Sequence, residues 1–214
     1  MADERVLDPI DRVSEVMFGL FMVLTFTGTL SAASAGRDDV RTMLAAAIGC
    51  NTAWGFVDGV MYLLRNLVAR GRQARLAREV RNAVDDEQGR RMIGDAIGRL
   101  AQGLDAAAIE RVRRWLADLP QAALPAAAIQ VRDLRGAIGI FLLVFASTFP
   151  VVLPFVFIGD LRLAMRASAA IAIAMMFGCG WAWGRYAGLT PWRSGLMLAL
   201  LGVAVEAVII ALGG

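Results

Sequence analysis

Long apolar runs constrain this chain more than any other feature of its sequence. Five windows, at residues 16–36, 42–64, 136–159, 167–184 and 194–214, cover half of the chain and contain only two formal charges, Asp58 and Glu206. A hydrocarbon core about 30 Å thick requires about 20 apolar residues in a helix. A soluble helical bundle would need charged outer faces on these segments, and they have none. The windows predict an all-α integral membrane protein with five transmembrane helices.

Composition supports this class and narrows the available chemistry. Hydrophobic residues make up 58% of the chain and charged residues 19%, against about 25% charged residues in soluble domains. All 22 basic residues are arginine, and there is no histidine. The commonest transition-metal ligand and the usual proton shuttle are therefore missing. We expect no enzyme, because no nucleophile–base pair or metal triad can be assembled without histidine.

One polar stretch divides the chain into three predicted parts. Residues 1–65 hold the N-terminal tail and the first two spans, residues 66–135 a small helical module, and residues 136–214 the last three spans. Within the module, residues 69–84 predict a basic helix that continues out of the second span, and residues 87–102 a second amphipathic helix. Asp105 is the predicted N-cap of a third helix over residues 106–119. The excess arginine suits anionic lipid headgroups, and we expect no nucleic-acid partner.

Arginine placement predicts the orientation in the bilayer. Six arginines between residues 65 and 81 follow the second span, and Arg132 and Arg135 precede the third. This bias places the N-terminus and residues 66–135 in the cytoplasm and the C-terminus outside. The acidic start of the chain lacks the basic n-region of a signal peptide. We expect a multi-pass protein of the cell inner (plasma) membrane.

Asp58 is the clearest ionisable residue inside a predicted span, and such residues are functional candidates by default. Helical spacing places the candidate path residues Glu15 and Met22 on one face of the first span. It places Asn51 and Asp58 on one face of the second span, with the candidate Met61 beside that face. Carboxylates, an amide and thioethers suit a divalent cation such as Mn²⁺ or Fe²⁺. The alternative, equally open, is that Asp58 is neutral or paired with Arg65 and fixes helix packing.

Glu206 is the second carboxylate inside a predicted span. It either relays protons, pairs across a helix interface, or is solvated near the outer surface. In the third span, Pro150 and Pro154 free two carbonyl oxygens, which either face a cavity or accompany a tolerated kink. Five helices are few to enclose a polar path. We therefore expect a homodimer with the path at the subunit junction.

The order of these parts resembles the vacuolar iron transporter (VIT-type) family over nearly the whole chain. SEVMFGL resembles the family's opening Glu-x-x-Phe-Gly stretch, and Val57-Asp58 resembles its Ala-Asp pair in the second span. PVVLPFVF resembles the proline-containing third span, and the loop before the last span ends in the similar Pro-x-Arg-Ser-Gly sequence. The resemblance implies homodimeric export of Fe²⁺ or Mn²⁺ from the cytoplasm, coupled to inward proton movement.

The sequence departs from the family at metal-handling positions. Phe21-Met22-Val23 stands where the family has Asn-Asp-Gly in the first span. The family's Ser-Met…Gly-Glu sequence after the second-span aspartate is absent, and Met61 matches its methionine only approximately. The resemblance implies a metal collector in the module, for which the acidic candidates are Glu79, Asp85, Asp86 and Glu87. Divalent-metal export is the first hypothesis. The alternative is a divergent membrane protein that keeps the fold but carries another solute, or has a structural or regulatory role.

Overall fold

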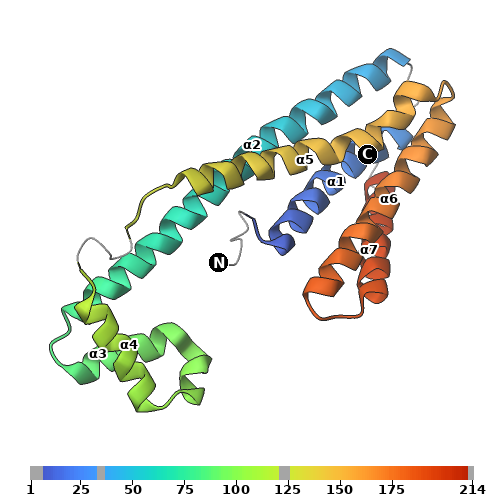
Figure 1. The fold of residues 1–214 in the computed structure, drawn as a ribbon. Helices are drawn as coiled ribbons and strands as arrows, with labels where there is room; N and C mark the ends of the chain where they lie inside the picture. The colour runs from blue at the N-terminus through green and yellow to red at the C-terminus, as the bar shows by residue number, and fades with distance from the viewer. Residues whose placement is uncertain (1–6, 33–36, 121–125, 212–214) are drawn as a thin grey trace. The chain divides into compact units, whose positions relative to one another are not determined.

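The structure is a computed structural model that describes residues 7–32, 37–120 and 126–211, and within these ranges every regular element is helical (Figure 1). The elements are α1 (Pro9–Ala32), α2 (Arg37–Arg81), α3 (Asp86–Ile97), the 3-10 helix η1 (Gly98–Gly103), α4 (Ala106–Asp118), α5 (Val131–Phe157), α6 (Leu161–Tyr186) and α7 (Pro191–Ala211). The predicted all-α class is confirmed. The chain forms two compact units: Met1–Tyr62 with Arg132–Gly214, here the apolar unit, and Leu63–Val131, here the polar unit.

Among the described residues, three helices of the apolar unit are long and apolar enough to cross a membrane. They are α5, α6 and the part of α7 over Pro191–Val208, and they coincide with the last three predicted spans. Helices α1 and α2 cover the first two predicted spans but are not among these three, so their crossing stays a prediction. Asn51 and Asp58 lower the mean hydropathy of α2. The side chains of α1 beyond Thr25 lie outside the described residues.

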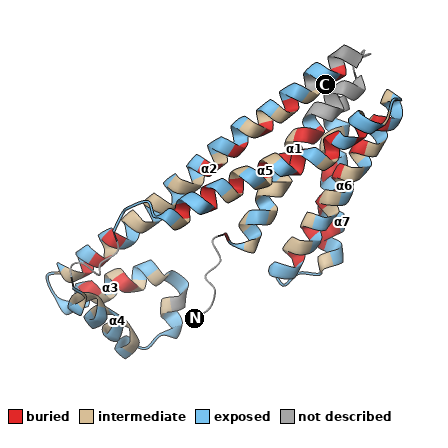
Figure 2. Ribbon diagram, turned by 45° about the horizontal axis from the view of Figure 1, so that its top comes forward, coloured by how far each residue is buried: buried red, intermediate tan, exposed pale blue. Residues whose placement is uncertain are grey.

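The core of the apolar unit lies where α1, α5 and α6 meet (Figure 2). Its completely buried side chains are Leu20, Val23, Leu24, Val151, Ala172 and Met176. The buried Ser168 of α6 donates a hydrogen bond to the Val151 carbonyl oxygen at 2.7 Å, which satisfies its hydroxyl and links α6 to α5. Helix α7 packs against α6, and Gly202 of α7 lies against Met176 of α6. Apolar burial and close helix contact together hold this unit.

The relative direction of the helices decides which polar side chains lie at the same level, that is, at the same position along the helix axes. Helices α1 and α2 run antiparallel (Figure 1). Along the contact of α2 with α5, Tyr62 lies at Gly136, Gly59 at Ala137, and Gly55 at Phe141. Rising numbers on one helix thus meet falling numbers on the other, so α5 is antiparallel to α2.

Helix α5 continues through both of its prolines. Each proline lacks a backbone N–H and leaves one carbonyl oxygen without its helical donor. The next turn is intact, because the Pro154 carbonyl oxygen accepts a hydrogen bond from the Ile158 N–H at 2.8 Å. The two prolines are therefore accommodated within a single helix that ends at Phe157.

The polar unit contains the end of α2 and three shorter elements. The basic stretch is helical to Arg81, and Asp105 caps α4 by accepting a hydrogen bond from the Ala108 N–H at 2.6 Å, so both predictions are confirmed. The predicted second helix is shorter than expected. It ends at Ile97 because Gly98 adopts a φ of +62°, a conformation that favours glycine, and the chain continues as η1.

Candidate functional site

A buried amide joins three helices of the apolar unit. Asn51 of α2 is completely buried, and its Nδ2 donates to the Gly19 carbonyl oxygen of α1 at 3.4 Å and to Thr148 Oγ1 of α5. Its Oδ1 atom is buried and accepts no hydrogen bond from the residues that the structure describes. Asn51, a predicted path residue, therefore also links α2 to α1 and α5 by hydrogen bonds.

Small residues let the backbones approach closely around this amide. A Cβ atom on Gly19 would collide with Ser147 of α5, and one on Gly59 would lie 3.0 Å from the Ala137 carbonyl oxygen. Gly136 leaves room in turn for the ring of Tyr62. The polar face of α2 predicted from helical spacing thus lies against α5. This packing fixes the rotation of α2 and hence the direction of Asp58.

Glu15 and Asp58 lie at neighbouring levels on two antiparallel helices. Glu15 is one turn from Gly19, about 6 Å along α1, and Asp58 is two turns from Asn51, about 10 Å along α2. Asn51 and Gly19 are in contact. Because the two helices are antiparallel, Glu15, which precedes Gly19, and Asp58, which follows Asn51, both lie toward the same end of the unit. Both side chains are half-buried, and Asp58 Oδ2 is completely buried. Two acidic side chains are thereby brought to one end of an apolar helical unit.

A third acidic residue at this end was missed by the sequence reasoning. Asp133 of α5 is only 3% exposed and precedes Ala137, the neighbour of Gly59, by one turn. Its position shortly before the uncharged window excluded it from the predicted span. Helical spacing places Asp133, Ala137, Ile140 and Val144 on one face of α5, and the structure shows that this face is the buried one.

The other path candidates do not gather with these carboxylates. Met22 is half-buried on α1, whereas Met61 is 48% exposed. Glu206 is half-buried on α7, one turn beyond Gly202, which lies near Leu24 of α1. Its level is therefore roughly 20 Å along the helices from that of Glu15. Glu206 does not share a site with Glu15 and Asp58 within one chain.

The four acidic candidates of the polar unit are engaged in ion pairs or helix capping. Glu79 pairs with Arg75 at 2.7 Å, and Asp86 with Arg113 at 3.0 Å. Asp85 caps α3 by accepting a hydrogen bond from the Gln88 N–H at 2.7 Å. Among the described residues, no three Asp, Glu or Cys side chains form a group able to hold a metal ion. A cation at these carboxylates would have to displace those partners.

Glu87, the fourth acidic candidate of the polar unit, forms ion pairs with two arginines. It binds Arg90 at 2.9 Å and Arg91 at 3.2 Å. Hydrogen bonds from Arg90 and then Arg91 lower the pKa of the Glu87 carboxyl below its ordinary value. Two guanidinium groups thus keep this carboxylate charged and occupied.

Glu110 is the most heavily engaged carboxylate in the polar unit. It accepts hydrogen bonds from Arg113 and Arg114 at 2.8 Å each and from Arg90 at 3.2 Å, and its side chain is 16% exposed. These bonds, from Arg113 first, hold the pKa of the Glu110 carboxyl far below its ordinary value. Because Arg90 belongs to α3 and Glu110 to α4, the cluster joins the two helices.

No protein-family model matches this chain, and no curated protein matches it in sequence.

Proposed function

We propose that this chain is a membrane transporter that exports a divalent metal cation, Fe²⁺ or Mn²⁺, from the cytoplasm. The observation that carries the proposal is the placement of Glu15 and Asp58 on adjacent antiparallel helices, half-buried at one end of an apolar unit. Acidic side chains within a membrane are costly and mark ion or proton pathways by default. Carboxylate oxygens are ligands for Mn²⁺ and Fe²⁺, and thioethers favour the softer ion.

The proposed arrangement in the bilayer has five spans, formed by α1, the apolar part of α2, α5, α6 and α7. The N-terminus and the polar unit are cytoplasmic, and the C-terminus is outside the inner (plasma) membrane. In this orientation Glu15, Asp58 and Asp133 lie toward the cytoplasmic end, where an exported cation enters. Glu206 lies toward the outer end, where an inbound proton would arrive.

The proposed path lies between two copies of the chain. Met61 is 48% exposed, and its neighbours Val57 and Val60 are also exposed. A thioether that faces away from its own helical unit contributes to a path only if a second copy covers that face. The resemblance to VIT-type proteins favours the same homodimeric arrangement, with proton antiport as the coupling. Cation binding to carboxylates releases protons, which supplies a physical basis for such coupling.

A second candidate function is favoured by the acidic residues of the polar unit. Arginine or a helix N-terminus already engages the side chains Glu79, Asp85, Asp86 and Glu87. Together with methionine at position 22, where the resembled family has aspartate, this favours a VIT-like protein that carries another solute or has a structural role. This alternative predicts no metal-stimulated flux.

Substitution of Asp58 tests the metal-export proposal. Asp58→Asn keeps the side-chain size but removes the charge, and we expect loss of metal tolerance in cells and of Mn²⁺ flux in proteoliposomes. Asp118→Asn, in the exposed last turn of α4, is the matched control and is expected to transport normally. Size-exclusion profiles show whether each variant remains folded. Full transport by folded Asp58→Asn would contradict the proposal.

A further inference from the structure

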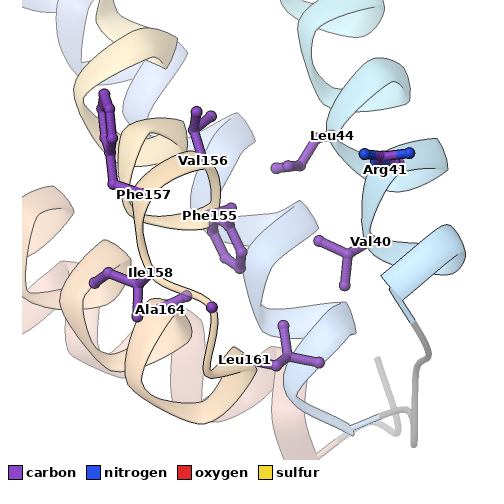
Figure 3. Close-up of a pocket in the computed structure, with 10 residues that line it drawn as sticks. Val40, Arg41, Leu44, Phe155, Val156, Phe157, Ile158, Leu161 and Ala164 are labelled. Carbon is purple, nitrogen blue, oxygen red and sulfur yellow. The ribbon is translucent and has the colours of Figure 1, made fainter.

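A pocket of about 310 Å³ lies among α2, α5 and α6, at the end of the apolar unit where α5 ends and α6 begins (Figure 3). Val40 and Leu44 of α2 extend toward Phe155 of α5, with Leu161 of α6 nearby (Figure 3). Arg41 also lines this pocket, which we call the α2–α5–α6 pocket. Its volume is within the range of small-molecule sites.

The described lining of this pocket is amphipathic. Among the residues that the structure describes, Arg41 is the one charged lining residue, and the other side chains are aliphatic or aromatic. Arg41 is exposed. A guanidinium beside an apolar hollow matches a ligand with an anionic head and a hydrocarbon body.

The surroundings of the pocket indicate where such a ligand comes from. Val156 and Phe157, at the last turn of α5, are 68% and 79% exposed and line the same pocket. Both α5 and α6 are long and apolar enough to cross a membrane, so their junction falls at the level of lipid headgroups. Large apolar side chains exposed in the last helical turn before such a junction face the adjoining hydrocarbon chains.

We propose that the α2–α5–α6 pocket binds one anionic phospholipid. The lipid phosphate binds Arg41, and an acyl chain lies against Leu44, Phe155 and Leu161. An arginine guanidinium binds a phosphate through charge-assisted hydrogen bonds. The site is far from Glu15 and Asp58 along the helices, so the inference does not depend on metal transport.

Native mass spectrometry of the full chain in detergent tests this proposal with phosphatidylglycerol as the probe. We expect one phosphatidylglycerol per chain to bind more tightly than phosphatidylcholine. Arg41→Gln should weaken phosphatidylglycerol binding roughly tenfold, the loss expected for a charge-assisted hydrogen bond. Leu161→Trp fills the apolar part and should weaken both lipids.

Two controls make the outcome decisive. Arg162→Gln removes an exposed arginine from the first turn of α6 that does not line the pocket, and it should leave phosphatidylglycerol binding unchanged. Glycerol 3-phosphate, which lacks the acyl chain, should not bind measurably. Equal phosphatidylglycerol affinity in wild type and Arg41→Gln would overturn the proposal. Glycerol 3-phosphate binding as tight as the lipid, or self-association that covers the pocket and excludes lipid, would also overturn it.

Discussion

At the scale of single residues, buried polar groups in the apolar unit are used to position helices. Asn51 reaches across to α1 and α5 through one amide nitrogen, while the neighbouring Thr52 hydroxyl donates to the Ile48 carbonyl oxygen of its own helix at 2.7 Å. Asn51 therefore forms hydrogen bonds between helices, whereas the adjacent Thr52 forms one within its own helix. Asn51 helps to fix the rotation of α2 about its axis. The direction of Asp58, two turns further along α2, depends on that rotation.

Asn51→Leu should destabilise the apolar unit. The substitution removes the hydrogen bonds to Gly19 and Thr148, and interhelical hydrogen bonds in membranes contribute about 0.5–2 kcal/mol. Thermal unfolding in detergent should show a lower midpoint for Asn51→Leu and an unchanged one for Thr52→Ala. If both variants unfold at the wild-type temperature, Asn51 does not hold these helices together.

The Glu110 cluster gives the polar unit a specific dependence on pH. The pKa of Glu110 lies below its unfolded value of 4.5 because Arg113, Arg114 and Arg90 stabilise the charged form. Its contribution is therefore fully present above about pH 4.5 and is lost as pH falls from there through the folded pKa. We expect Glu110→Gln to weaken the contact of α3 with α4 at neutral pH and to reduce this acid sensitivity.

Hydrogen exchange of α3 and α4, corrected for intrinsic rates, measures this effect at neutral and acidic pH. Glu79→Gln is the control, because Glu79 and Arg75 form an exposed pair within one helix, and such pairs contribute little. Exchange in α3 and α4 that responds equally to both substitutions would contradict a special role for Glu110.

Some residue-level features were predictable and others were not. Asp105 at the start of α4 followed from local capping chemistry, which depends on a few neighbouring residues. Asp58 stood out because a charge within an apolar window is rare. Burial of Asp133 depends on which face of α5 packs inward, and the pairing of Asp86 with Arg113 joins two helices. Such tertiary contacts leave no mark in local composition.

At the scale of helices, glycine positions decide where backbones meet. A Cβ atom on Gly180 would lie 2.5 Å from the Ser194 carbonyl oxygen of α7, whereas one on Gly178 would meet no atom within 4 Å. Hydropathy locates the helices in the sequence, but it does not distinguish the glycines that lie at helix contacts from those that do not. That distinction requires the register of α6 against α7, which the short connecting loop and packing set together.

Gly180→Ala should separate α6 from α7, and Gly178→Ala should not. Overpacking of this kind costs about 1–3 kcal/mol, because the atom in the way belongs to the backbone and cannot rotate aside. The apparent unfolding midpoint in detergent measures both variants side by side. Equal midpoints for the two variants would show that the α6–α7 contact is looser than described.

At the scale of the whole molecule, the function proposed for the carboxylates requires the proposed five-span arrangement. If α2 crosses the bilayer, Thr42 near its start and Arg111 in the polar unit lie on opposite sides of the membrane. Thr42→Cys should then react with an impermeant thiol reagent from outside intact cells, and Arg111→Cys only after the cells are opened. Cys50 and Cys179 are replaced in both variants to remove background. Labelling of both positions from the same side would show that α2 does not span.

The proposed export of a divalent cation is tested most directly by flux in proteoliposomes. Purified protein is reconstituted, Mn²⁺ and then Fe²⁺ are presented under an imposed pH gradient, and metal and internal pH are followed together. We predict metal movement with opposing proton movement in wild type, and neither above empty liposomes in Asp58→Asn. Wild-type protein that is folded and correctly inserted but moves neither metal would contradict the account.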